Sequence, residues 1–320
     1  MIVSFGEALV DLFATPRGAA LDEAERFVPC LGGAPANVAV VLARLGIASR
    51  FVGAVGRDAH GDRLARALAT AGVDTAALLR VPERTGMTFV RVAADGARSF
   101  LFYRAGGADY ALSAEHLAAL AAHPLEGARW LHVNSSALVA QPLAGAARWL
   151  LDAAADRGVP VSLDLNVRPH LWADPSALGS AVRDLAVRAA WVKSSEDDLA
   201  ALGLPPTLDS LAALCPGAVP VLTLAERGAA ARVGATAVTR PAPRLAADAV
   251  VDATGAGDAF VAGVLATLWE QGATPGTDAF ADPRCWAAAL TRGCVLGARA
   301  VTALGATEAL RDLADPVPGR

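Results

Sequence analysis

The sequence predicts an α/β protein built on a mostly parallel β-sheet, and three observations lead to this expectation. Short apolar runs rich in β-branched residues alternate with alanine- and leucine-rich segments at helical spacing, which is the pattern of repeated βαβ units. The chain has 320 residues, 54% of them hydrophobic, so it can bury a large core. Only residues 87–104 break the alternation, because two strand-like runs follow each other there without a helix between them.

The apolar runs define the expected strands, and the segments between them define the helices. The strands are expected at residues 2–5, 50–54, 130–133, 160–165, 191–193, 219–224 and 249–251. The helices are expected to include residues 35–45, 62–71, 144–157, 178–186 and 257–271. Residues 87–92 and 98–104 flank an Asp95-Gly96 turn, which predicts a β-hairpin that could form a flap over the main sheet.

Charge and composition exclude several classes of protein. Acidic residues outnumber basic ones by 32 to 28, giving a net charge of −4 without any run of like charge, so we expect no nucleic-acid partner. No apolar segment reaches the length of about 18 residues that a membrane-spanning helix needs. Glu7 and Asp11 lie where a signal peptide would be apolar, so we expect a cytoplasmic protein.

The reactive side chains narrow the chemistry. The four cysteines lack C-x-x-C spacing and the five histidines lack an H-E-x-x-H motif, so neither a zinc site nor a disulfide framework is indicated. Lys193 is the only lysine, and it follows Val192 where a P-loop requires glycine. Walker-type ATPases are therefore excluded.

The strongest local signal is the segment DATGAGD, residues 252–258, which leads into an apolar helical pattern. Gly255 and Gly257 leave the backbone N–H groups of a helix N-terminus open to an anion, and the helix dipole adds partial positive charge there. Asp258 lies beside this cradle, where it could act as the base that phosphoryl transfer to a hydroxyl requires. The alternative is a glycine-rich turn with an ordinary first-turn aspartate.

A second glycine pair, Gly32-Gly33, precedes another expected helix that carries Asn37. The glycines would let a polyol approach the backbone, and Asn37 offers both a donor and an acceptor, although such a pair is commonly just a turn. Further polar residues end the apolar runs, where ligands bind in open α/β sheets. They are Asp11, Asn134, Asp164, Asn166, Arg168, Thr223 and Asp252, and turn formation or helix capping could equally explain each of them.

These motifs together resemble the ribokinase-like carbohydrate kinases of the phosphofructokinase-B type, over nearly the whole chain. The resemblance rests on GGAPANVAVVLARLG, GAVGRDAHG, DLNVRPHLW, VKSSEDDL and DATGAGDAFVAGVL, in the order and spacing of that family. It implies a three-layer α/β sandwich with a mostly parallel central sheet and a small β-sheet lid. It also implies one domain over residues 1–320, with the lid formed mainly by about residues 86–106 and part of 11–31. The implied reaction moves the γ-phosphoryl group of Mg-ATP to a sugar hydroxyl.

The resemblance also implies a role for each matching residue. Asp258 would be the general base, with Gly255, Ala256 and Gly257 as the anion hole. The substrate contacts would be Asp11, Gly32, Gly33, Asn37, Tyr103, Arg104 and Arg168. The nucleotide contacts would be Lys193, Ser195, Thr223, Ala225 and Gly228, together with Gly255 and Gly257. Asp198 would contact Mg²⁺ through water, and Asp252 and Thr254 match positions that bind a monovalent cation such as K⁺ in some relatives.

The chain departs from the family pattern at three places. Residues 195–198 read Ser-Glu-Asp-Asp where the family has Asn-x-x-Glu, and these acids could instead simply stabilise a helix N-terminus. Ala225 replaces a usual glycine, and Cys294 lies where asparagine is common. The last two changes bear on adenine binding rather than on the reaction.

The hairpin and the DLNVRPHLW motif look most like those of fructokinases, which convert fructose to fructose 6-phosphate. Kinases of 2-keto-3-deoxygluconate hold a carboxylate with arginines, a role open to Arg104 and Arg168. Aminoimidazole riboside kinases share a segment like Gly107-Ala-Asp109, so both alternatives stay open. A non-catalytic regulator of the same fold would be expected to lack Asp258 or the glycines. Relatives commonly form homodimers through the lid, which we also expect here.

Overall fold

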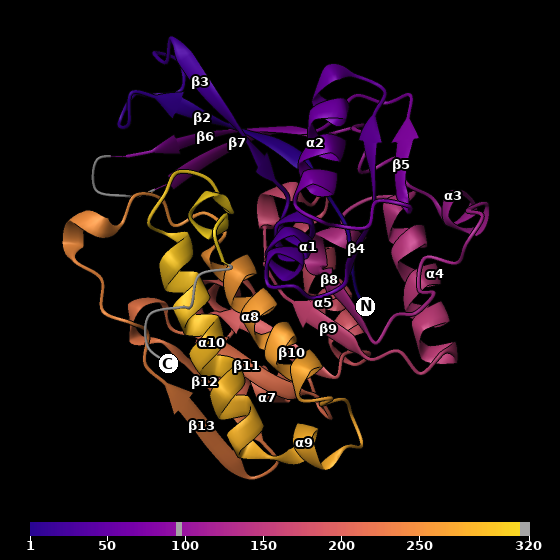
Figure 1. The fold of residues 1–320 in the computed structure, drawn as a ribbon, viewed down its shortest axis with the longest axis vertical. Helices are drawn as coiled ribbons and strands as arrows, with labels where there is room; N and C mark the ends of the chain where they lie inside the picture. Colours follow the sequence, from indigo (N-terminus) through magenta and orange to yellow (C-terminus); the bar gives the residue numbers. More distant parts are fainter. Residues whose placement is uncertain (94–97, 314–320) are drawn as a thin grey trace.

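The computed structural model describes residues 1–93 and 98–313, and it contains two separate β-sheets (Figure 1). The larger sheet has nine strands in the order β13-β12-β11-β10-β9-β8-β1-β4-β5. The seven strands from β11 to β5 are parallel, and β12 and β13 add an antiparallel hairpin at one edge. In that order the bounds are Thr236–Arg240, Ala229–Val233, Val219–Thr223, Trp191–Ser195, Val161–Asp164, Trp130–Asn134, Ile2–Phe5, Ser49–Gly56 and Leu78–Val81.

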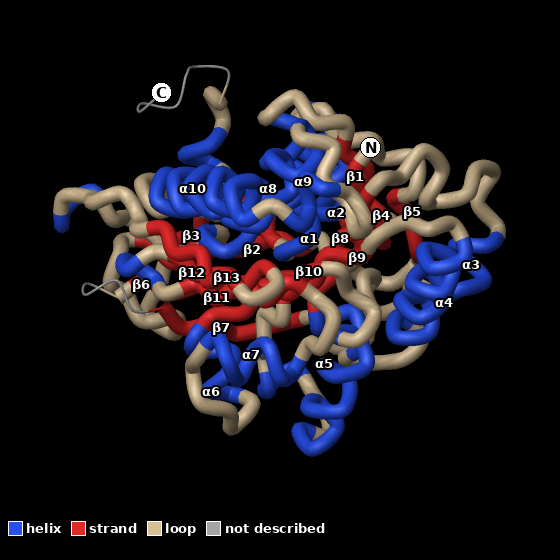
Figure 2. The backbone as a smooth tube through the Cα atoms, turned by 90° about the horizontal axis from the view of Figure 1, so that it is seen from below, coloured by secondary structure: helices blue, strands red, loops and turns tan. Residues whose placement is uncertain are grey.

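Helices cover both faces of this sheet, which makes three layers (Figure 2). One face carries α1 (Ala34–Arg44), α2 (Ala59–Thr70), α8 (Ala256–Glu270), α9 (Asp278–Ala281) and α10 (Pro283–Ala300). The other face carries α3 (Ala114–Ala118), α4 (Leu143–Asp156), α5 (Leu178–Ala186), α6 (Glu196–Ala201) and α7 (Leu208–Leu214). Parallel sheets need such double cover, since their strands are apolar on both sides.

The core consists of apolar clusters on the two sides of the sheet. Side chains alternate along each strand, so Ile2 packs with α8 and α10 while Val3 packs with α4. Trp191 of β10 meets Trp286 of α10 edge to face, with ring centroids 6.0 Å apart. The high alanine and valine content therefore fills a sheet that is buried on both faces. No helix in the described residues combines the length and the apolar character needed to cross a membrane.

The smaller sheet lies apart from the larger one and forms a lid (Figure 1). Its order is β3-β2-β6-β7, with β3 at Arg26–Gly32, β2 at Leu9–Thr15, β6 at Met87–Val92 and β7 at Arg98–Tyr103. Strands β2 and β6 are parallel, and the other two pairings are antiparallel. Both strands of the predicted hairpin are thus confirmed, whereas its Asp95-Gly96 turn lies outside the described residues.

Three details differ from the sequence predictions. The strand predicted at residues 249–251 is wrong, because Val251 and Asp252 donate their N–H groups to the Val301 carbonyl after α10 rather than to a neighbouring strand. Asp11 does not follow the first strand but lies within β2, opposite Thr88 of β6. Sequence analysis also missed the β12–β13 hairpin and α10, although Gly234 at φ 58° marks the turn of that hairpin.

Candidate active site

A cavity of about 1130 Å³ lies between the lid, the carboxyl ends of the parallel strands and the start of α8. Strands β9, β10 and β11 contribute Asp164, Ser195 and Thr223 from their ends. Carboxyl ends of neighbouring parallel strands meet at one edge, which is where open α/β sheets bind ligands. The other polar or glycine groups around the cavity include Glu7, Asp11, Gly33, Asn37, Thr88, Arg98, Arg104, Ser136, Arg168, Lys193, Asp197, Asp198, Gly228, Thr254, Gly255, Gly257 and Asp258.

Helix α8 begins inside the cavity at a glycine that no other residue could replace without strain. Gly255 is left-handed, at φ 79°, and a Cβ there would lie 2.5 Å from Ala306. Gly255, Ala256 and Gly257 all line the cavity. The Ala256 N–H donates to the Ala253 carbonyl over 3.4 Å, whereas the N–H groups of Gly255 and Gly257 have no backbone partner in the described residues and are open to the cavity. Together with the helix dipole, this arrangement suits an anion.

Asp258 lies in the first turn of α8, and its carboxylate lines the cavity. Desolvation in the cavity raises the pKa of Asp258 to about 7, although a hydrogen bond from Asn37 lowers the pKa in part. That bond runs from Nδ2 of Asn37 to Oδ2 of Asp258 over 2.8 Å. A carboxylate with a pKa near neutral can accept a proton from a bound hydroxyl.

The single lysine lies beside α8 but is already paired. Nζ of Lys193 is 3.0 Å from Asp164, and both side chains are buried. The same amino group lies 3.1 Å from where a Cβ on Gly257 would be, so glycine leaves it room. Lys193 therefore adds a positive group next to the anion cradle while Asp164 balances its charge.

Asp198 opens helix α6 at the same edge of the sheet, and its carboxylate is held by the backbone. Its two oxygens accept the N–H groups of Ser195 and Val167, each over 2.8 Å, and the Ser195 hydroxyl accepts the N–H of Asp198 over 3.1 Å. This is a reciprocal capping box. Asp198 still lines the cavity with Asp197.

Within residues 1–93 and 98–313, no three His, Cys, Asp or Glu side chains are grouped so as to hold a metal ion. Mg²⁺ in phosphoryl-transfer sites is commonly held by one or two carboxylates together with water and substrate phosphates. Asp197 and Asp198 fit that chemistry, because carboxylates supply the hard oxygen ligands that Mg²⁺ prefers.

Asp11, Gly33, Asn37 and Arg104 gather at the lid end of the cavity. Burial raises the pKa of Asp11 to about 7. Gly33 adopts φ 95°, and a Cβ there would lie 2.4 Å from the Glu7 carbonyl oxygen. Oδ1 of Asn37 is buried without a partner in the described part of the chain, which leaves an acceptor for a ligand hydroxyl.

Four residues expected in the site do not line the cavity, and one of them is Asn134, whose buried amide donates to Glu7. Tyr103 lies on the opposite face of β7 from Arg104, where it is 59% exposed and packs edge to face on Phe89. Gly32 instead packs against the Asp11 carboxylate, which is 2.2 Å from its hypothetical Cβ. Asp252 is buried behind the cavity, where its carboxylate accepts hydrogen bonds from Thr254 and Gly305 and shapes the loop before α8.

The other sequence-predicted residues line the cavity: Asp11, Gly33, Asn37, Arg104, Arg168, Lys193, Ser195, Asp198, Thr223, Ala225, Gly228, Thr254, Gly255, Ala256, Gly257 and Asp258. Sequence analysis missed Glu7, which accepts hydrogen bonds from Ala34, Asn134 and Ser136. It also missed Arg98, Phe100 and Phe102 of the lid. Their alternation along β7 with Arg104 is a signal that could have found them.

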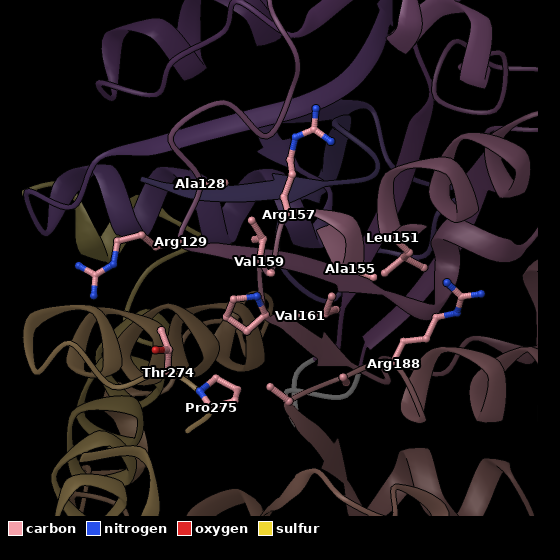
Figure 3. Close-up of a pocket in the computed structure, with 14 residues that line it drawn as sticks. Ala128, Arg129, Leu151, Ala155, Arg157, Val159, Val161, Arg188, Thr274 and Pro275 are labelled. Atoms are coloured by element: carbon pink, nitrogen blue, oxygen red, sulfur yellow. The ribbon is translucent and has the colours of Figure 1, made fainter. Parts of the chain in front are cut away.

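A second hollow, of about 620 Å³, lies at the opposite edge of the sheet, before β8, β9 and β10 (Figure 3). The side chains of Arg129, Arg157 and Arg188 point away from its centre. Arg188 pairs with Asp152, and Arg129 lies over the ring of Trp269. Polar groups therefore converge at the carboxyl edge of the sheet and diverge at the amino edge.

Comparison with known proteins agrees with this geometry. Residues 1–313 match the model of the pfkB family carbohydrate kinases. The chain belongs to this family. As a pfkB carbohydrate kinase, it is a phosphotransferase.

Relatives of this pfkB kinase include several fructokinases. A fructokinase from Klebsiella pneumoniae is 38% identical over 313 residues, covering 95% of this chain and 94% of the relative. The crystal structure of fructokinase from Vibrio cholerae with fructose, ADP and calcium bound has a TM-score of 0.82 and 31% identity, covering 97% of this chain and 95% of that one. The crystal structure of aminoimidazole riboside kinase from Salmonella enterica, with aminoimidazole riboside and an ATP analogue, has a TM-score of 0.81 and 28% identity. The match covers 98% of this chain and 97% of that one. The pfkB kinase thus has the ribokinase-like fold that its sequence predicts.

Proposed function

We propose that this kinase transfers the γ-phosphoryl group of Mg-ATP to a hydroxyl of fructose, giving fructose 6-phosphate. The observation that carries the proposal is Asp258, a carboxylate with a pKa near 7 beside an open helix N-terminus. The chain would act as one domain, since Asp11 and Asn37 near its start share a cavity with Asp258 near its end. The fructokinase relatives support fructose as the acceptor.

In the proposed reaction, Asp258 takes the proton from the attacking sugar hydroxyl as the new P–O bond forms. The bond between the γ-phosphorus and the β–γ bridging oxygen of ATP breaks, and ADP leaves. Asn37 orients the Asp258 carboxylate through their 2.8 Å hydrogen bond. The backbone N–H groups at the start of α8 hold the negative charge on the phosphoryl group, which is the main task in phosphoryl transfer. Asp11 and Arg104 would bind other hydroxyls of the sugar.

The nucleotide would lie along the part of the cavity that leads away from the lid. Ser195, Thr223, Ala225 and Gly228 line that part, and Lys193 lies near the anion cradle. Asp198 would hold Mg²⁺ through water, because each of its oxygens already accepts one backbone N–H. When bound, Mg²⁺ would neutralise charge on the phosphates. Thr254 and the loop that Asp252 shapes would bind a monovalent cation such as K⁺.

Two other acceptors remain to be tested against fructose. Aminoimidazole riboside is supported by the bound structural relative and by Gly107-Ala-Asp109. 2-Keto-3-deoxygluconate is less well supported, because Arg104 is already engaged by Asp109 over 2.6 Å. That pairing leaves Arg104 little net charge for a carboxylate.

The test is ATP-dependent ADP release with fructose, ribose, 2-keto-3-deoxygluconate and aminoimidazole riboside, each compared by kcat/KM. We expect fructose to have the highest value. A higher value for another sugar would replace fructose by that sugar, and binding of sugar and ATP without ADP release from any of them would indicate a non-catalytic regulator.

We also propose that two copies associate through the lid. On one face of β6 and β7 the exposed side chains of Leu101 and Tyr103 lie beside the ring of Phe89, which Tyr103 meets edge to face. Such a contiguous apolar surface is commonly covered in a stable protein. Light scattering should give twice the mass of 32.5 kDa, and Leu101→Lys should shift it toward the monomer. A monomeric wild-type protein at micromolar concentration would contradict this proposal.

A further inference from the structure

A buried cluster of three charged residues lies beneath the lid end of the cavity. Nε and Nη2 of Arg104 both donate to Oδ2 of Asp109, over 3.1 and 2.6 Å. The Glu7 carboxylate is 3.9 Å from Nη2. All three side chains are at most 5% exposed. One guanidinium is therefore placed between two carboxylates, where water does not screen the charges.

The three residues of the cluster lie at different depths from the cavity. Arg104 and Glu7 line the cavity, whereas Asp109 lies behind them. The second oxygen of Asp109 is buried without a partner in the described residues, so Arg104 is the group that balances its charge. Nη1 of Arg104 likewise has no partner in that part of the chain, and it remains available to a ligand.

Glu7 is fixed by contacts other than Arg104. It accepts hydrogen bonds from the Ala34 N–H, from Asn134 and from the Ser136 hydroxyl, the last over 2.6 Å. Asp11 and Asp258 add further carboxylates to the same end of the cavity. The lid end of the cavity thus offers hydrogen-bond donors to hydroxyls. Its carboxylates balance the positive charge of Arg104, so this end has no net positive charge.

We propose that Asp109 and Glu7 set the charge selectivity of the sugar pocket. Their two carboxylates balance the positive charge of Arg104. Nη1 of Arg104 can then donate to a hydroxyl of an uncharged sugar, whereas the carboxylate of an acidic sugar is repelled. Asp109 does not touch the sugar, and it acts by positioning Arg104 and balancing its charge. This inference rests on the proposed sugar kinase activity and assigns that pocket a determinant of neutral over acidic substrates.

The test compares fructose with 2-keto-D-gluconate, which is fructose with its C1 alcohol oxidised to a carboxylate. Dissociation constants from calorimetry give a selectivity ratio that does not depend on turnover. We expect the wild-type protein to bind 2-keto-D-gluconate at least about tenfold more weakly than fructose. Equal or tighter binding of the acid would overturn the proposal.

Asp109→Asn keeps the shape of the side chain and removes its charge. We expect it to shift the selectivity ratio toward the acid by at least about tenfold, because Arg104 then has a net charge to offer. Glu7→Gln should shift the ratio in the same direction and provides a second variant. Asp74→Asn, which removes a similar partner from Arg50 far from the cavity, is the matched control and should leave the ratio unchanged.

A purely structural role for Asp109 predicts a different result. Both dissociation constants would then rise by the same factor, and an unchanged ratio in Asp109→Asn and Glu7→Gln overturns the proposal. Failure of the proposed function is distinguishable, since it would appear as no ADP release by the wild-type protein whatever the ratio. Fructose turnover with an unchanged ratio would overturn only the selectivity role.

Discussion

Helices α6 and α8 both begin at the edge of the cavity, and each carries an aspartate at the third helical position. In α6 the residue before the helix is Ser195, and the Asp198 carboxylate closes a capping box with it. In α8 the equivalent residue is Gly255, which has no side chain to cap with. The Asp258 carboxylate instead accepts a hydrogen bond from Asn37 of another helix.

This difference shows how one helix position can serve structure or chemistry. Both carboxylate oxygens of Asp198 accept hydrogen bonds from backbone N–H groups, so Asp198 stabilises the fold and keeps a fixed orientation. Asp258 is desolvated with one side-chain donor, so its pKa rises to about 7 and it can take up a proton. The glycine before α8 also leaves the backbone N–H groups of its first turn open to an anion.

The largest effect is expected from removing the base. Asp258→Asn keeps the size and the hydrogen bond to Asn37, and we expect ADP release with fructose to fall about 10²- to 10⁴-fold while fructose still binds. Asp278→Asn changes an exposed first-turn aspartate of α9 and should have no effect. A full rate in Asp258→Asn would show that another group accepts the proton.

Changing the glycine before α8 should have the next largest effect. Gly255→Ala strains a left-handed residue and places a Cβ against Ala306, so the N–H groups of the anion cradle must move. We expect kcat to fall about 10²-fold. Gly276→Ala is the control, because Gly276 has a similar φ of 88° but no atom near a Cβ. Equal losses in the two variants would mean that backbone strain, rather than the cradle, lowers the rate.

The pH dependence should follow the raised pKa values of Asp258 and Asp11. Both are about 7, and the base must be ionised to accept a proton, so kcat/KM should fall at least tenfold per pH unit below that value. In Asp11→Asn, the acidic side of the pH profile should show a single ionisation, that of Asp258. A flat profile between pH 8 and pH 5 would be incompatible with Asp258 as the base.

The smallest effect on activity is expected at the other helix. Asp198→Asn should lower kcat by about tenfold, because in the proposed site the residue would hold the metal only through water. The measurement is ADP release at saturating Mg-ATP. A loss as large as that of Asp258→Asn would give the two aspartates equal catalytic weight and remove the distinction between the helices.

Much of the fold was predictable because the parallel strands are buried on both faces and show as short, mostly apolar runs, as β1 and β11 do. The predicted strand at 249–251 failed since β-branched residues alone do not provide a neighbouring strand to pair with. The β12–β13 hairpin was missed because its residues are small and alternate weakly with polar ones.

The candidate site was predictable where local motifs create it, as at Gly255–Asp258. It was not predictable where distant segments meet. Glu7 just before β2 and Arg104 just after β7 come together because β6 pairs with both strands, and no local pattern links Glu7 to Arg104 and Asp109. Tyr103 was expected in the site because the resemblance marks the segment, whereas the alternation of β7 decides which of its side chains face the cavity.

The distinction between the two aspartates is tested most directly by thermal unfolding of Asp258→Asn and Asp198→Asn at pH 8. The folded state holds the Asp258 proton more tightly than the unfolded chain, whose Asp pKa is about 3.8, so ionisation destabilises the folded state as pH rises from about 4 to 7. At pH 8 Asp258 is ionised in the folded protein, and the full destabilisation by its charge is present. Asp258→Asn removes it and should raise the free energy of unfolding by on the order of 2 kcal/mol.

Asp198→Asn should have the opposite sign. An amide offers one acceptor oxygen in place of two, so one backbone N–H loses its partner and the free energy of unfolding should fall by about 1–3 kcal/mol. Opposite shifts of the two melting temperatures at pH 8 are the predicted result. Destabilisation by both substitutions to a similar extent would contradict the account of Asp258 as a desolvated base and Asp198 as a cap.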